Sequence, residues 1–347
     1  MIKIEVPGKL FLIGEYSIMN PGNEAILISI DRFISVTIEE SSVYELSSNY
    51  GHFKWILDNQ EPVLNYTTLP HAKAAIYIAH RYLKHLGIRP SIYKIMIETE
   101  LNHQDGQKYG LGSSGAVLIA VIKAILYFHG ILVSKEQLFK LCVLSQLEIS
   151  DLTSGGELAA SIYTGWVAYK RYNPIFLFNH TGNLMDLVNQ DWPGLKIQRL
   201  KITKYFPAIC YSGIVQSTKD YIEKINQNDL KSIFYKAFIS KAKLCVSQFK
   251  KALTANNDEL VSQSISIYRQ LMLDLQNWAQ IQIETPTFSK MIKVANNLGI
   301  TAKVSGAGYG DCGVAITTSH KQKLELNQAW EAADLMPLDL NVWEGSF

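Results

Sequence analysis

The sequence has little cysteine, and its cysteines do not stand in a pattern that builds a covalent or metal-bound framework. No two of the four form a Cys-x-x-Cys pair, and the eight histidines include no His-Glu-x-x-His. A disulfide-stabilised scaffold and a structural zinc site are therefore not indicated. We predict that the cysteines are small buried side chains; they are Cys142, Cys210, Cys245 and Cys312.

Long apolar runs and an excess of charge of one sign are also missing. The most apolar stretch, residues 115–128, contains Lys123 and falls short of the roughly 20 residues that cross a bilayer. The first residues include a glutamate and a proline where a secretory signal needs an apolar segment. The 33 lysines and arginines nearly balance the 31 aspartates and glutamates and are scattered, which does not favour nucleic-acid binding. We expect a cytoplasmic protein with neither a nucleic-acid nor a membrane partner.

The composition is that of an ordinary globular protein with room for two domains. A chain of 347 residues exceeds one ordinary core, and 48% hydrophobic with 18% charged residues excludes disorder. No internal repeat or low-complexity tract is visible. The character of the sequence changes near residues 190–205, so we predict one domain over residues 1–200 and another over residues 201–347.

Hydrophobic periodicity predicts a sheet followed by helices in the first half of the chain. Apolar positions at helical spacing predict an amphipathic helix over residues 71–86, and residues 113–128 are apolar on nearly every side, as in a buried helix. Ser134 is the expected N-cap of a further helix. Residues 218–298 are expected to be largely helical, and residues 302–316 to form a glycine-rich β segment. Short β-rich runs separated by Gly, Pro and Asn predict strands joined by turns; they are residues 2–6, 10–13, 25–28, 33–38 and 43–46.

A glycine-rich segment before the buried helix is the first candidate for chemistry. Its sequence is Gly110-Leu111-Gly112-Ser113-Ser114-Gly115. Backbone N–H groups at such a turn converge on phosphate oxygens, and the helix N-terminus adds about 0.3–1 kcal/mol, or ~2 kcal/mol when partly buried. The serines add hydroxyls for a phosphate or for magnesium; alternatively, one of them caps the helix. No Gly-Lys-Ser/Thr follows a glycine loop, which excludes a P-loop.

The same letters satisfy the Gly-x-Gly-x-x-Gly pattern of dinucleotide-binding folds. That pattern is weak by itself, and residues 308–313 match it a second time. A dinucleotide site places the glycines directly after a strand in a tight βαβ unit. Here a polar segment separates the expected strand from the glycines, and the buried helix leads into another helix. The dinucleotide hypothesis is therefore the weaker of the two.

Three segments together resemble the GHMP kinases. That family has an N-terminal Pro-Gly-Lys-x-x-x-x-Gly-Glu, a central Gly-Leu-Gly-Ser-Ser-Gly/Ala-Ala and a C-terminal Gly-Ala-Gly-x-Gly, in this order. This chain has Pro7-Gly8-Lys9 with Gly14-Glu15-Tyr16, then residues 110–116, then Ser305-Gly306-Ala307-Gly308-Tyr309-Gly310. Tyr16 and Lys108 look most similar to bacterial phosphomevalonate kinases, because mevalonate kinases usually have Gly-Glu-His at the first motif.

The resemblance implies an α+β, two-lobed GHMP kinase-like fold. Residues 1–200 would form a ribosomal-protein-S5-like β/α domain that binds nucleotide, and residues 201–347 a ferredoxin-like α+β domain that completes the acceptor site. The implied reaction is ATP-dependent phosphorylation of 5-phosphomevalonate to 5-diphosphomevalonate, in the mevalonate route to isoprenoids, with ATP and Mg²⁺ as cofactors. A monomer or a homodimer is expected.

The same resemblance suggests roles for individual residues. Lys9, in a turn between strands, is expected to stabilise the migrating phosphoryl group. Glu157 is expected to be the working carboxylate, where relatives have an aspartate paired with that lysine, and Ser113 a magnesium ligand. The expected nucleotide-binding residues are Lys108, Gly110, Leu111, Gly112, Ser113, Ser114 and Gly115. The expected substrate-binding residues are Lys9, Ser154, Gly155, Ser217, Thr218, Ala307 and Gly308.

Departures from the family pattern keep alternatives open. Glu157 replaces the usual aspartate, Leu152 replaces an asparagine, and Gln146 stands where mevalonate-type members have an acidic metal ligand. The alternatives are another GHMP small-molecule kinase, such as a mevalonate kinase, or a catalytically weak nucleotide-binding sensor with the GHMP fold. Glu157 can also be a simple helix-start acid, and Ser217 with Thr218 a helix N-cap.

Overall fold

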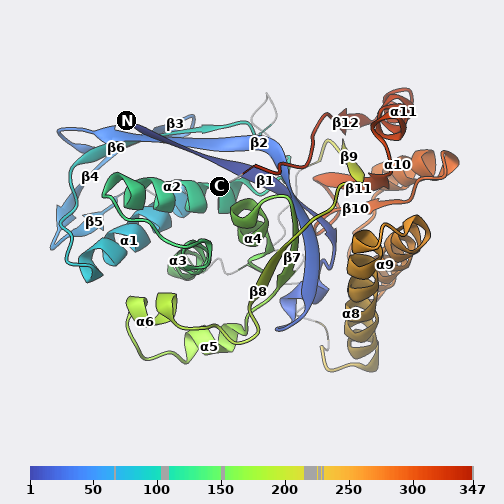
Figure 1. Ribbon diagram of the computed structural model, residues 1–347, viewed down its shortest axis with the longest axis horizontal. Coiled ribbons are helices and arrows are strands. Elements are labelled where there is room, and N and C mark those ends of the chain that lie inside the picture. The colour runs from blue at the N-terminus through green and yellow to red at the C-terminus, as the bar shows by residue number, and fades with distance from the viewer. Residues whose placement is uncertain are drawn as a thin grey trace.

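The described part of the chain forms two β-sheets, one in each half of the molecule (Figure 1). The computed structural model describes residues 1–65, 68–102, 109–149, 153–214, 225, 228 and 230–345. Over these ranges the first sheet has eight strands in the order β5-β4-β3-β6-β2-β7-β8, with β1 paired to β2. They are β1 (Ile2–Ile13), β2 (Glu24–Glu40), β3 (Tyr44–Ser48), β4 (Gly51–Asp58), β5 (Glu61–Val63), β6 (Tyr93–Thr99), β7 (Trp166–Lys170) and β8 (Lys196–Leu200).

β1 and β2 are the two longest strands of this sheet and pair with each other antiparallel, while β2 also pairs with β6 and β7. The sequence predicts two short strands in place of each, and that prediction is wrong. The pairing shifts register between Pro7 and Gly8 and between Phe11 and Ile13, but neither shift ends the strand. A bulge adds a residue to one strand and bends it without a turn. The first motif therefore lies inside β1.

Helices cover one face of the first sheet, as Figure 1 shows for α1 to α4. α2 packs against β1, β2 and α1 and is buried on nearly every side, as its sequence predicts. α3 begins at a capping box: Ser134 accepts from the N–H of Gln137, whose side chain accepts from the N–H of Ser134. The helices are α1 (Pro70–His85), α2 (Ser113–Phe128), α3 (Lys135–Glu148) and α4 (Gly156–Tyr163).

A second sheet, with four strands over the described residues in the order β10-β11-β9-β12, carries the C-terminal half. Helices α10 and α11 pack on it, while α8 and α9 pack on each other. The tail returns to the first sheet, where Trp343 N donates to Ser29 O over 3.0 Å. The elements are β9 (Phe206–Tyr211), β10 (Ala302–Val304), β11 (Cys312–Thr317), β12 (Met336–Leu338), α8 (Ile233–Thr254), α9 (Asp258–Ala279), α10 (Pro286–Asn297) and α11 (His320–Glu331).

The α+β class predicted from the sequence is confirmed, and so are the cysteines, which are free and buried. The predicted helices over residues 71–86 and 113–128 match α1 and α2. Short elements such as α5 (Pro174–Phe178) and α6 (Leu184–Asn189) were not predicted, because they have too few periodic positions to show a pattern.

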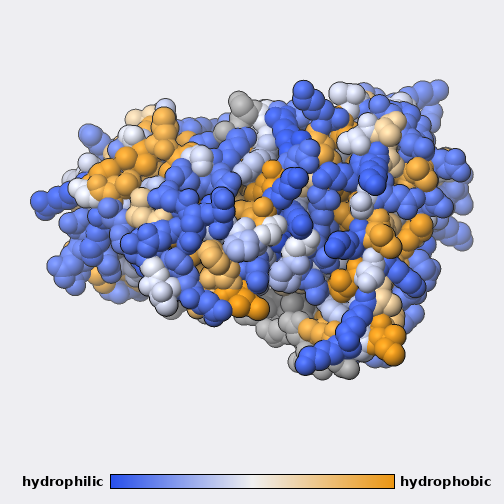
Figure 2. Space-filling model, turned by 60° about the horizontal axis from the view of Figure 1, so that its bottom comes forward, coloured by the Kyte–Doolittle hydropathy of each residue, from blue (hydrophilic) through white to orange (hydrophobic). Residues whose placement is uncertain are grey.

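The surface carries no broad apolar belt on the face drawn in Figure 2, where apolar residues occur in separate groups among hydrophilic ones. Among the described residues, no helix has both the length and the apolar character that a membrane span requires.

Candidate active site

Lys9 lies in the middle of β1, directly after the register shift between Pro7 and Gly8. Its N–H donates to Leu111 O over 2.8 Å, and its Nζ donates to Gly110 O over 3.2 Å. A Cβ on Gly8 would lie 2.9 Å from Leu111 O, so a larger residue would push the strand away from the glycine loop. The first and second motifs are thus joined through main-chain contacts. Lys9 is paired with Ser29 of β2 inside a continuous strand and does not lie in the predicted turn.

The glycine loop forms the start of α2. Gly112 is the N-cap, with a left-handed φ of 86°, and a Cβ there would lie 2.9 Å from Lys9 Cε. Because glycine is the N-cap, the alternative that Ser113 or Ser114 caps the helix is wrong. Neither serine hydroxyl forms a hydrogen bond with a described residue. The first N–H groups of a helix have no acceptor within it, so this end presents N–H groups and two hydroxyls to a ligand.

The third glycine-rich segment connects β10 to β11 and reaches both other motifs. At one end, Tyr16 Oη donates to Ala307 O over 2.5 Å. At the other end, a Cβ on Gly110 would lie 2.1 Å from Asp311 Cγ, so this glycine is also required by close packing. Between them, Gly308 has a φ of 84° and lies against Ile283. All three motifs therefore meet at the amino end of α2.

A buried ion pair that the sequence analysis missed holds the first and third motifs together. Glu15 Oε1 lies 2.5 Å from Lys303 Nζ, and the two side chains are 2% and 1% exposed. The same oxygen accepts from Gly306 N over 3.3 Å, and Tyr268 Oη donates to Glu15 O over 2.7 Å. The place of Glu15 in the first motif indicated that this residue is important. Nothing in the sequence, however, indicates that it pairs with a lysine 288 residues away.

Glu157 lies in the first turn of α4, against the first turn of α2. A Cβ on Gly115 would lie 2.8 Å from Glu157 Cγ. Its Oε1 accepts hydrogen bonds from Thr153 Oγ1 and from Gln146 Nε2, the latter over 3.1 Å. Over the described residues it forms no ion pair with Lys9, whose Nζ donates to a backbone carbonyl instead. The predicted lysine–carboxylate pair is replaced by two neutral donors.

The loop that leads to Glu157 is fixed from β7. Tyr169 Oη donates to Ser154 O over 2.7 Å, and burial raises the pKa of Tyr169 well above its ordinary range, so the hydroxyl keeps its proton. Gly155 has a φ of 81°, and a Cβ there would lie 2.7 Å from that hydroxyl. Ser154 Oγ accepts from Gly156 N over 3.2 Å. The predicted positions Lys108, Leu152, Ser217 and Thr218 lie outside the described residues.

Comparison with known proteins agrees with this arrangement of motifs. The family model "GHMP kinases N terminal domain" matches residues 71–165, and "GHMP kinases C terminal" matches residues 249–333. A phosphomevalonate kinase of Streptomyces sp. (strain CL190) is 31% identical over 96% of this chain and 95% of its own length. The chain belongs to the GHMP kinases.

Solved structures resemble this GHMP kinase over its whole length. A Lin0012 protein from Listeria innocua has a TM-score of 0.92 and 30% identity, covering 99% of both chains. Phosphomevalonate kinase of Streptococcus pneumoniae, in complex with phosphomevalonate and AMPPNP, has a TM-score of 0.87 and 25% identity, covering 99% of this chain and 100% of that one.

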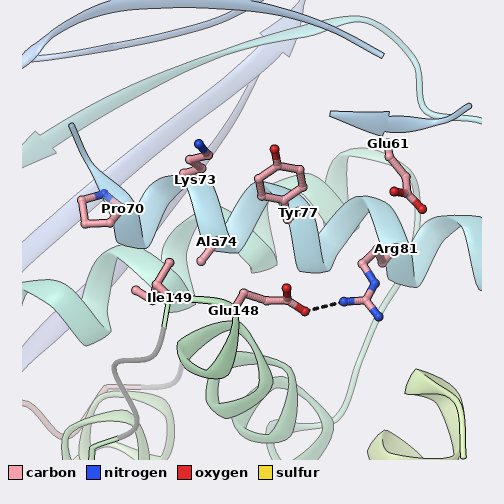
Figure 3. A pocket seen from close by; sticks show the side chains of 8 residues that line it. All are labelled: Glu61, Pro70, Lys73, Ala74, Tyr77, Arg81, Glu148 and Ile149. Carbon is pink, nitrogen blue, oxygen red and sulfur yellow. Dashed lines mark hydrogen bonds and ion pairs between the residues drawn. The ribbon is translucent and has the colours of Figure 1, made fainter. Parts of the chain in front are cut away.

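A groove also opens on the N-terminal half of this GHMP kinase, between α1, β5 and the end of α3. Its volume is about 710 Å³, and Figure 3 shows Glu148 reaching across to the guanidinium of Arg81. Of the predicted site residues that the structure describes, none lines it. The lining residues are Glu61, Pro70, Lys73, Ala74, Tyr77, Arg81, Glu148 and Ile149.

Proposed function

We propose that this GHMP kinase transfers the γ-phosphate of ATP to the phosphate of 5-phosphomevalonate and forms 5-diphosphomevalonate. The observation that carries the proposal is the meeting of all three motifs at the amino end of α2, in a chain that is 31% identical to a phosphomevalonate kinase over 96% of its length. In the transfer, the bond between the γ-phosphorus and its bridging oxygen breaks, a bond to an acceptor phosphate oxygen forms, and ADP leaves.

Lys9 supports the transfer as a fixed positive charge beside the loop that holds phosphate. Its Nζ lies 3.2 Å from Gly110 O and its stem packs on Gly112, and both contacts hold the lysine beside the start of α2. A charge pair 4 Å apart is worth about 4 kcal/mol at an effective dielectric near 20. Preorganised charge of this kind lowers the barrier because it meets the charge that spreads over the migrating group.

The acceptor needs orientation more than it needs a base. A phosphate monoester has a second pKa of about 6, so its oxygen is already largely ionised near neutral pH. The role proposed for Glu157 is to orient the acceptor at the start of α2. Ser154, Gly155, Ala307 and Gly308 stay predicted substrate contacts; Ala307 offers its N–H and methyl group, because its carbonyl accepts from Tyr16.

The donor set at this site fits a magnesium ion that enters with ATP. The described residues contain no group of three or more His, Cys, Asp or Glu side chains that could hold a metal ion by themselves. Magnesium in kinases is bound by one or two protein oxygens together with substrate phosphates and water, and the hydroxyl of Ser113 could supply such an oxygen. When bound, magnesium neutralises charge on the β- and γ-phosphates.

A panel of acceptors tests the proposal. Purified protein with ATP and Mg²⁺ is assayed for ADP release with 5-phosphomevalonate, mevalonate, galactose and no acceptor. We expect ADP release with 5-phosphomevalonate to exceed that with mevalonate by at least about tenfold, since a dianionic acceptor is attracted more strongly to the positive charge of Lys9. Preference for mevalonate or a sugar would favour the other GHMP kinase activities, and ATP binding without turnover on any acceptor would favour the sensor.

A further inference from the structure

Glu157 is anchored through one oxygen and leaves the other free. Both of its hydrogen bonds end on Oε1: Thr153 Oγ1 donates one, and Gln146 Nε2 donates the other over 3.1 Å. Among the described residues, Oε2 accepts no hydrogen bond, and it is not a buried unpartnered atom. The carboxylate therefore has a fixed oxygen on the side of α3 and an accessible one.

The hydroxyl of Thr153 is fully engaged, so it has a single orientation. A hydroxyl has one proton and two lone pairs. Thr153 Oγ1 accepts from Gly155 N over 3.1 Å and from Gln146 Nε2 over 3.2 Å, and its proton points to Glu157. A donor bond to a carboxylate is about twice as strong as one to a neutral amide oxygen. This is why the proton goes to Glu157 rather than to Gln146 Oε1, 3.3 Å away.

The backbone of Thr153 is held as firmly as its side chain. Arg171 Nη2 donates to Thr153 O over 3.1 Å, and Nη1 donates to Met19 O. Arg171 is 4% exposed. Its guanidinium joins the loop before α4 to the short helix η1 (Ser17–Met19), which directly follows the first motif. The position of Thr153 is therefore tied to the segment that directly follows the motif that carries Lys9.

We propose that Thr153 and Gln146 are positioning residues that hold Oε1 of Glu157, so that Oε2 faces the acceptor. The inference rests on the proposed function. It accounts for glutamate where relatives have aspartate, because the anchored oxygen draws the longer side chain back toward α3. Gln146 fits this role because its amide N–H donates to Oε1, which an ionised carboxylate at position 146 could not do.

The kinetic test compares Thr153→Val, which keeps the shape and removes the hydroxyl, with Thr153→Ser, which keeps the hydroxyl. We expect Thr153→Val to lower kcat with 5-phosphomevalonate by about 10- to 100-fold, with KM for ATP within about threefold, since a small misplacement of a positioned group has an effect of this size. Thr153→Ser should restore kcat to within about threefold. Thr254→Val, on the exposed surface of α8, is the matched control without effect.

Glutamate length gives a second kinetic arm. Glu157→Asp keeps the charge but is one methylene too short to hold both donors and still reach the acceptor. We expect kcat to fall by about tenfold or more. Wild-type kcat in Thr153→Val, or a faster Glu157→Asp enzyme, would overturn the proposal while leaving the proposed function intact.

A stability cycle tests the contact without relying on turnover. Wild type, Thr153→Val, Glu157→Leu and the double variant are unfolded in urea. Removing a hydrogen bond to a charged group lowers the folded-to-unfolded ratio by about tenfold or more. The drop in this ratio caused by Thr153→Val should therefore be about tenfold smaller when Glu157 is already replaced by leucine. Coupling below about twofold would overturn the proposal. Should wild type release no ADP with 5-phosphomevalonate, the proposed function fails, and this cycle alone decides whether Thr153 holds Glu157.

Discussion

Two carboxylates near the amino end of α2 have opposite environments. Glu15 is buried, with its charge matched by Lys303 at 2.5 Å and a further N–H bond from Gly306. Glu157 is half-buried and has neutral donors from Thr153 and Gln146 on one oxygen. The first carboxylate is closed off by its partner, whereas the second keeps an accessible oxygen.

The difference separates a structural acid from one that is available for chemistry. Removing one member of a buried ion pair leaves an uncompensated buried charge, which lowers the free energy of unfolding. A carboxylate with a free oxygen and neutral partners retains its capacity to orient a ligand. The comparison predicts that variants of Glu15 or Lys303 change stability first, and variants of Glu157 change turnover first.

The largest expected effect is on the buried pair. Lys303→Met removes the cation and leaves Glu15 buried without a partner, which should lower the free energy of unfolding by about 3–5 kcal/mol. Urea denaturation measures it. The double variant Glu15→Gln/Lys303→Met should recover part of the loss, because no charge is left buried.

An exposed ion pair on β1 is the control. Lys3 and Glu5 lie 2.7 Å apart with side chains 54% and 53% exposed, and Lys3→Met should leave the free energy of unfolding nearly unchanged. Equal losses for Lys3→Met and Lys303→Met would remove the distinction between a buried and a surface pair.

Glu157→Gln tests the other side of the comparison. The substitution keeps the shape and removes the charge, so kcat should fall by roughly 10³-fold, which corresponds to about 4 kcal/mol of transition-state stabilisation. Steady-state kinetics give kcat, and a thermal melt should place the midpoint within a few degrees of wild type. Normal kcat with lowered stability would make Glu157 a helix-start acid.

Lys9→Ala should lower kcat by about 10²- to 10³-fold with a smaller effect on ATP affinity, because a preorganised charge acts mainly on the transition state. Titration with an ATP analogue and steady-state kinetics separate the two quantities. The nearby Lys3→Met variant serves again as control. A loss confined to ATP affinity would mean that Lys9 anchors the ground state only.

A buried group that is kept neutral sharpens the contrast with the buried ion pair. His80 is fully buried, with Nε2 2.6 Å from Tyr93 Oη, and burial, with His129 nearby, lowers the pKa of His80 to about 4. The folded state therefore binds the proton more weakly than the unfolded chain, whose histidine pKa is about 6.5. The contribution of neutral His80 to the free energy of unfolding is therefore fully present above about pH 6.5. It falls by roughly 3 kcal/mol as the pH falls toward about 4.

Urea denaturation between pH 4 and pH 8 measures this loss. His80→Gln should make the free energy of unfolding less dependent on pH between pH 4 and 6.5. His52→Gln, at an exposed histidine beside Glu45, should leave that pH dependence unchanged. An unchanged acid limb in His80→Gln would assign the acid sensitivity to other groups.

Local patterns were enough to predict much of the fold and part of the site. The burial of α2, the capping box at Ser134 and the free buried cysteines follow from periodicity, capping chemistry and spacing, which are properties of neighbouring residues. The glycine loop at the start of α2 was found for the same reason. The continuity of β1 across Pro7 and Gly8 was not predicted. Proline and glycine are typical both of turns and of strand irregularities, and only the pairing with β2 distinguishes the two.

The sequence by itself determined which residue types are available to handle phosphate: a lysine after glycine, serines at a helix start and a carboxylate at the start of α4. Only the tertiary structure decided how they are paired. Glu15 found Lys303 across 288 residues, and Glu157 took Thr153 and Gln146 in place of Lys9. Such partners depend on which sheets and helices come together, and side-chain contacts between distant segments leave no periodic trace in a single chain.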